Sequence, residues 1–148
     1  MAGSKATKAT EATKAMKAAF VDTSCLVAIA LGEPGSRKVA TRLAEYEAVF
    51  ASGLLEAELK AILRREELPG DLRELIPELQ WVCPDRPLTD EIDQVLEAGY
   101  VKGADAWHLA CALYLSPGGR ELRFETLDAR QRTVASKLGF KPGSGLGY

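Results

Sequence analysis

Short apolar runs alternate with longer helical stretches along most of the chain, and this alternation is the feature that most constrains the fold. Strands are predicted at residues 18–21, 49–51, 81–83 and 122–126, with a last one near 140–141. Helices are predicted from after Asp22 to near Gly32 and at residues 36–46, 53–67, 89–100, 104–115 and 129–138. Strands that alternate with helices are typical of a parallel sheet covered on both faces. We therefore expect an α/β fold, doubly wound around a central, mostly parallel sheet.

The first 17 residues differ in composition from the rest of the chain. They are rich in Ala, Thr and Lys, and we expect this leader to lie outside the fold as a basic arm or a short surface helix. Residues 18–148 then form a single domain, which agrees with the length of the chain. Residues 1–19 hold four lysines and one glutamate, so a net charge of −2 for the whole chain leaves −5 for the remainder. Taken as a total, this charge argues against a nucleic-acid partner.

The composition also excludes several classes of protein. Three cysteines in apolar settings, Cys25, Cys83 and Cys111, argue against a secreted disulfide framework. No apolar run approaches the roughly 20 residues of a membrane span, and no signal-peptide core follows Met1. Neither a Walker-type nor a dinucleotide glycine motif is present, so we expect no nucleotide or organic cofactor. We predict a cytoplasmic protein without a membrane partner.

Aspartates occur where a ligand site of such a fold is expected, beyond the carboxyl ends of the strands. Asp22 follows the first predicted strand and Asp128 follows the fourth, while Asp105 opens a very apolar helix. Each of the three also has a simpler explanation, because Asp is a preferred residue at the N-cap of a helix. The pattern leaves both interpretations open.

Glu58 is less easily explained as a surface residue. It lies within the apolar stripe that Leu55, Leu59 and other residues form along one face of the predicted 53–67 helix. A glutamate that faces the core is costly unless it is paired or bound to a cation. The alternative is that the helix rotates and Glu58 reaches solvent at the edge of the sheet.

Together these four carboxylates predict an acidic pocket that a divalent cation would neutralise. Ligation by oxygen alone favours Mg²⁺ or Mn²⁺ over zinc, and the chain has a single histidine. Such ions suit displacement at phosphorus, because they activate a water and stabilise the charged phosphate and leaving oxygen. Without these four acids the chain beyond the leader is close to neutral, so with metal bound an RNA partner is no longer disfavoured.

Four segments around these acids carry a family resemblance. In order along the chain they are Phe20-Val21-Asp22-Thr23-Ser24, Ser52 with Glu58-Leu59, Gly103-Ala104-Asp105-Ala106-Trp107-His108-Leu109-Ala110, and Thr126-Leu127-Asp128-Ala129-Arg130. They resemble the PIN-domain nucleases, and among them the VapC-type toxins of bacterial and archaeal toxin–antitoxin pairs. The resemblance covers about residues 18–142. It implies a three-layer α/β/α sandwich with a Mg²⁺- or Mn²⁺-dependent ribonuclease site.

The resemblance also implies roles for individual residues. The acidic quartet is Asp22, Glu58, Asp105 and Asp128, with Asp22 and Asp105 as the principal metal ligands and the other two completing the pocket directly or through water. The hydroxyls of Thr23, Ser24 and Thr126 would orient the carboxylates, although helix capping and strand-end hydrogen bonds explain them equally well. The implied partners are an RNA substrate, a second copy of the chain in a homodimer, and a cognate antitoxin that reaches into the acidic groove.

Arginines near the acids are candidates for binding the phosphates of the substrate. Arg64 and Arg65 end the helix that carries Glu58, and Arg130 follows Asp128. Solvated helix ends are the alternative explanation for each, and Arg130 is the preferred functional candidate.

Two other residues lie close to the predicted site in the sequence. His108 lies one helical turn after Asp105, and we interpret it as a hydrogen-bonded packing residue because its helix is strongly apolar. Glu125 precedes Thr126 and lies one residue out of phase with it along the strand, so we leave Glu125 out of the pocket.

Two classes of function remain. The first is a hydrolase, a metal-dependent endoribonuclease that acts as the toxin of a toxin–antitoxin pair. The second is an interaction module of the same fold that binds an antitoxin or RNA without significant turnover. A receiver-like phosphoacceptor domain ranks last, because its lysine should follow the final strand directly and Lys141 comes too late.

Overall fold

A computed structural model describes residues 17–76 and 78–143, so leader residues 1–16 lie outside the described part. Its centre is a five-stranded sheet in the order β3-β2-β1-β4-β5, in which every pair of neighbouring strands is parallel. The strands are β1 (Ala18–Val21), β2 (Ala48–Ser52), β3 (Leu79–Val82), β4 (Arg123–Glu125) and β5 (Lys141–Pro142). The expected parallel sheet is therefore confirmed, and it is parallel throughout rather than mostly.

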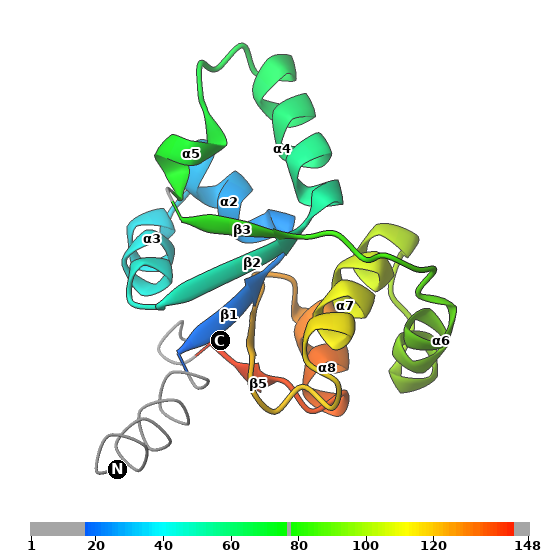
Figure 1. Ribbon diagram of the computed structural model, residues 1–148. Helices are drawn as coiled ribbons and strands as arrows, with labels where there is room; N and C mark the ends of the chain where they lie inside the picture. The colour runs from blue at the N-terminus through cyan, green and yellow to red at the C-terminus, as the bar shows by residue number, and fades with distance from the viewer. Residues whose placement is uncertain (1–16, 77, 144–148) are drawn as a thin grey trace, which may run out of the picture.

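Helices cover both faces of this sheet (Figure 1). One face carries α2 (Thr23–Ala30), α3 (Ser36–Ala44), α4 (Gly53–Arg65) and the short α5 (Leu72–Leu75). The other carries α6 (Thr89–Ala98), α7 (Gly103–Leu115) and α8 (Ala129–Lys137). The protein is thus a three-layer α/β/α sandwich. In the part of the chain that is described, no helix has the length and apolar character that crossing a membrane requires.

The alternation of side chains along β1 divides the core into two halves. Phe20 packs with α6, α7 and α8, whereas its neighbour Val21 packs with α2, α3 and α4, and both are fully buried. Phe20 stacks on Phe124 of β4 with ring centroids 5.8 Å apart. Each fully buried side chain of this size contributes about 1.5–3 kcal/mol to folding. Burial on both faces explains why the central strand β1 is a short apolar run without polar alternation.

Several element boundaries differ from the prediction. Strand β3 begins at Leu79 and ends at Val82, so Cys83 lies beyond it and is exposed rather than in an apolar setting. All three cysteines are free. The helix α5 was not expected, because a four-residue helix carries too little periodicity to be recognised. Helix α7 begins at Gly103 with Lys102 at its N-cap, so Asp105 lies in the first turn and not at the cap.

The strand order places β1 at the point where the chain changes direction across the sheet. From β1 the chain continues to β2 and β3 on one side, and it returns to β4 and β5 on the other. Ligand sites of doubly wound sheets lie beyond the carboxyl ends of the strands at this switch point. The residues that follow β1 and β4 are Asp22 and Thr126, so both lie there.

Candidate functional site

Asp22 is the most buried of the predicted acids, with 3% of its surface exposed. It occupies the N-cap position of α2, and its two carboxylate oxygens accept hydrogen bonds from hydroxyls. Ser24 donates to Oδ1 at 2.6 Å and Thr126 donates to Oδ2 at 2.5 Å. Ser24 also accepts from the backbone N–H of Leu127, so it joins the segments that follow β1 and β4.

Burial raises the pKa of Asp22 to about 6, because desolvation disfavours the charged carboxylate. The hydroxyls of Ser24 and Thr126 oppose this effect, and weaker opposition comes from His108 and the backbone N–H of Cys25. Among the described residues no lysine or arginine pairs with Asp22. Asp22 is therefore a buried acid whose charge the protein itself leaves without a cationic counterpart.

Glu58 lies at the edge of the buried stripe of α4, which consists of Leu55, Leu59 and Leu63. Its side chain is 34% exposed, so it neither faces the core fully nor extends into solvent. Its Oε1 accepts a hydrogen bond from the Thr23 hydroxyl at 2.7 Å and lies 2.9 Å from Nε2 of His108. Both explanations drawn from the sequence are thus partly right, because the side chain bridges the interior and the surface.

Asp105 and Asp128 lie near each other. The pKa of Asp105 is raised, first by desolvation, then by repulsion from Asp128, with a smaller contribution from Glu58. Asp128 is exposed and caps α8 by accepting the backbone N–H of Gln131 at 2.8 Å, so the capping explanation holds for this residue. The side chain of Gln131 in turn donates to the backbone carbonyl of Asp105 at 3.3 Å. The fold therefore joins the start of α7 to the start of α8.

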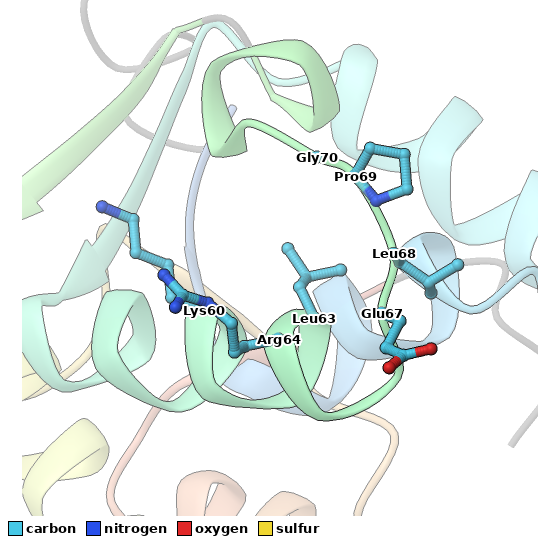
Figure 2. Close-up of a pocket in the computed structure, with 7 residues that line it drawn as sticks. All are labelled: Lys60, Leu63, Arg64, Glu67, Leu68, Pro69 and Gly70. Carbon is cyan, nitrogen blue, oxygen red and sulfur yellow. The ribbon is translucent and has the colours of Figure 1, made fainter.

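The candidate arginines are less closely placed. Arg130 is exposed in the first turn of α8, two residues after Asp128. Arg64 and Arg65 lie at the far end of α4, about 10 Å along the helix axis from Glu58. Arg64 lines a cavity between that end of α4 and the loop that follows (Figure 2). This cavity has a volume of about 680 Å³, and none of the four acids lines it. Arg65 pairs with Glu66 instead.

Comparison with known families agrees with this geometry. A family model described as PIN domain matches residues 19–137, which include all four acids and most of the sheet. The chain belongs to the PIN domain family. PIN domains are typically nucleases that use divalent metal ions. A search of curated proteins finds no matching sequence.

The donor chemistry of this PIN domain suits a divalent ion of that kind, although its acids are not gathered into a ready-made cluster. Within residues 17–76 and 78–143, no group of three or more His, Cys, Asp or Glu side chains is close enough to hold a metal ion. The buried charge of Asp22 and the repulsion felt by Asp105 are what a bound cation would relieve. The ligands are carboxylates and hydroxyls, which are the oxygen donors that Mg²⁺ and Mn²⁺ prefer.

Three buried polar residues of the PIN domain contribute contacts that the sequence reasoning did not assign to the site. Ser52 and His108 lie within 2.8 Å of each other, and Gln131 connects Asp105, Thr126 and Asp128. Two signals were available. The spacing Asp128-x-x-Gln131 is typical of a capping box, and His108 lies one turn from Asp105.

Glu125 belongs to a separate cluster on the opposite face of β4. Because it pairs in register with Val21, its side chain faces the α2–α4 layer, as its strand phase predicted. It is fully buried, and its Oε1 accepts from Nε of Arg42 at 2.8 Å and from the hydroxyl of Tyr46. Burial and the bond to Glu125 raise the pKa of Tyr46. This acid is neutralised by the protein's own guanidinium.

Proposed function

We propose that this PIN domain is a metal-dependent endoribonuclease that hydrolyses RNA phosphodiester bonds at the acids beyond β1 and β4. The observation that carries the proposal is Asp22, a buried carboxylate with hydroxyl partners and no cationic one, located at the switch point of the sheet. An acid held in this way is a candidate for ligating a cation. Asp105 adds a second carboxylate with a raised pKa.

In this proposal each residue has a defined task. Asp22 and Asp105 are the principal ligands of a Mg²⁺ or Mn²⁺ ion, and Glu58 and Asp128 complete the pocket directly or through water. A divalent ion there supplies activation of the attacking water and neutralisation of the charge on the phosphate. The hydroxyls of Ser24 and Thr126 hold the carboxylate of Asp22, and Thr23 holds that of Glu58.

The arginines have different tasks in the same proposal. Arg130, in the first turn after Asp128, is close enough along the chain to contact a phosphate beside the scissile bond. Arg64 and Arg65 are too far along α4 for that phosphate, so we assign them to phosphates further along the RNA.

One observation favours a second candidate function. Because the described residues contain no preformed group of three metal-ligating side chains, the domain would also suit a module that binds RNA or an antitoxin without turnover. The two functions differ in one measurable property, which is cleavage that depends on a metal ion.

The deciding experiment is cleavage-site mapping on total RNA with Mg²⁺, with Mn²⁺ and with EDTA. We expect defined cuts with either metal, none with EDTA, and a loss of about 100-fold or more in rate for Asp22→Asn and Asp105→Asn. Asp93→Asn, an exposed carboxylate of α6, is the matched control and should cleave like the wild type. Undiminished cleavage by both site variants, with circular dichroism confirming the fold, would reject the site assignment. Stable RNA binding without cuts would favour the module.

The proposal also covers the protein partners and the cellular location. We propose a VapC-type toxin that acts in the cytoplasm, in which residues 18–148 form the single domain and a cognate antitoxin enters the acidic groove. Support for a homodimer comes from an apolar groove of about 520 Å³ lined by residues of α6, α7 and the segment between them. Two of the residues that line this groove are exposed, Leu96 at 44% and Tyr100 at 70%.

A further inference from the structure

His108 is a buried imidazole that joins three elements of the fold. It lies on α7 with 1% of its surface exposed, among apolar neighbours such as Leu109 and Ala110. Its Nδ1 lies 2.8 Å from the hydroxyl of Ser52 at the end of β2. Its Nε2 lies 2.9 Å from Oε1 of Glu58 on α4 and 3.2 Å from the hydroxyl oxygen of Thr23 on α2. Both ring nitrogens therefore have partners.

These partners determine which ring nitrogen carries a hydrogen. An ionised carboxylate can only accept, so Nε2 must donate to Oε1 of Glu58. In the neutral ring Nδ1 is then the acceptor, and the Ser52 hydroxyl donates to it. The opposite neutral tautomer would place two lone pairs against each other at 2.9 Å, which is unfavourable. Glu58 thus selects the tautomer in which the ring donates to it, and the Ser52 hydroxyl, which can donate or accept, supplies the hydrogen that Nδ1 accepts.

The two carboxylate oxygens of Glu58 therefore differ in their hydrogen bonds. Oε1 receives the hydrogen of the imidazole and that of the Thr23 hydroxyl. Oε2 has no hydrogen bond or ion pair with any residue of the described part of the chain. A carboxylate whose first oxygen is held by two donors from α2 and α7 keeps one orientation, and its second oxygen stays available.

We propose that His108 is a positioning residue, which ties back Oε1 of Glu58 so that Oε2 is the oxygen offered to a divalent cation. This inference rests on the proposed metal-dependent function and deepens it, since it assigns a task to a residue that touches neither substrate nor cation. Ser52 is part of the same arrangement because its hydroxyl is the partner of Nδ1 in that tautomer. A packing role alone would need a partner for each ring nitrogen but would not need one of them to be Glu58.

Two substitutions separate positioning from packing. In His108→Gln the side-chain amide reaches the position of Nε2, so a donor to Glu58 is kept and the contact with Ser52 is lost. In His108→Asn the amide reaches only the position of Nδ1, so the contact with Ser52 is kept and the donor to Glu58 is lost. Both variants replace the imidazole with a smaller side-chain amide and leave similar packing defects in the core. Each is therefore a control for the other.

The readout is Mn²⁺ affinity of the RNA-free protein, measured by electron paramagnetic resonance. We expect His108→Asn to weaken Mn²⁺ binding by about 10-fold or more, as removal of a group that orients a ligand typically does. His108→Gln should retain most of the wild-type affinity. Equal weakening by both variants, or wild-type affinity of His108→Asn, would overturn the inference.

A second measurement does not depend on metal binding or on either variant folding. Nitrogen NMR of the wild-type imidazole should find the hydrogen on Nε2, with Nδ1 as the acceptor or, if the ring is charged, with hydrogens on both. A neutral ring that carries its hydrogen on Nδ1 would overturn the inference. If wild-type protein binds no Mn²⁺ while the Nε2 hydrogen is present, the proposed function fails and the hydrogen-bond device stands.

Discussion

Two buried carboxylates lie side by side where β1 and β4 end, and the protein neutralises only one of them itself. The backbone N–H of Asp22 donates to the carbonyl of Glu125 at 3.1 Å, so the two residues are direct neighbours across the sheet. Glu125 faces the α3 layer and pairs with the guanidinium of Arg42. Asp22, beyond the last pair in register, has the hydroxyls of Ser24 and Thr126 as its side-chain partners.

The difference between the two acids distinguishes a structural charge from a candidate functional one. A buried acid that is paired with a fixed cation destabilises the fold when that cation is removed, and while it is paired it gains little from an external ion. A buried acid held by hydroxyls keeps a raised pKa and gains most when a cation arrives from outside. Proximity across the sheet would group the two acids, whereas the partners of their side chains separate them.

The largest expected effect is on the Glu125 side. Arg42→Met removes the guanidinium but keeps much of the side-chain volume, and it leaves a fully buried glutamate without its cation. We expect a loss of about 3–5 kcal/mol in the free energy of unfolding, measured by urea denaturation. The control is Lys60→Ala, which removes an exposed ion pair with Glu56 and should cost about 0–1 kcal/mol. A similar small loss for both variants would mean that the Glu125 cluster is not a structural pair.

Substitution of Asp22 is expected to change the free energy of unfolding in the opposite direction, towards higher stability. The pKa of this carboxyl is about 6 in the folded protein against 3.8 for the ordinary group, so the folded state holds its proton to higher pH than the unfolded chain. Ionisation of Asp22 therefore costs stability, a cost absent well below pH 3.8 and complete above about pH 6. Asp22→Asn should stabilise the metal-free protein by about 1–3 kcal/mol at pH 8 and by little at pH 4.

Urea unfolding in EDTA at several pH values measures this difference. The design is sharpened by Glu125→Gln, which disturbs the neighbouring acid and should destabilise at pH 8 rather than stabilise. A destabilisation by Asp22→Asn that is equal at pH 5 and pH 8 would contradict the assignment of an unpaired buried charge to Asp22.

The smallest expected effect concerns the hydroxyls that hydrogen-bond to the carboxylate of Asp22, which has no cationic partner among the described residues. Ser24→Ala removes a donor to the carboxylate and an acceptor for the N–H of Leu127, at a cost of about 1 kcal/mol. Because the lost donor favours the charged form, the pKa of Asp22 should rise above about 6, as carbon NMR of the carboxyl would measure. Thr133→Ala, an exposed hydroxyl bonded to its own helix, should leave that pKa unchanged. An unchanged pKa of Asp22 in Ser24→Ala would show that the Ser24 hydroxyl does not stabilise the charged carboxylate.

The sequence predicted much of this architecture because periodicity is local. Apolar runs such as the one ending at Val21 identify strands, and the residue that follows each strand is then placed at the correct edge of the sheet. The interpretation of His108 as hydrogen-bonded and buried was also correct. The short helix α5 and the position of Asp105 in α7 were missed, since caps and single turns leave weak signals.

The amino-acid sequence by itself determined the parallel α/β layers, the edge of the sheet where the acids lie and the separate phase of Glu125. These features follow from the two-residue and 3.6-residue periods of strands and helices, which any stretch of chain displays on its own. The tertiary structure alone decided which partner each polar group has. In the folded protein Glu125 pairs with Arg42, Asp22 accepts hydrogen bonds from hydroxyls, and Glu58 contacts the imidazole of His108. Apart from Ser24 with Asp22, these pairings join residues 50 to 104 positions apart, and they depend on how packed layers bring distant side chains together.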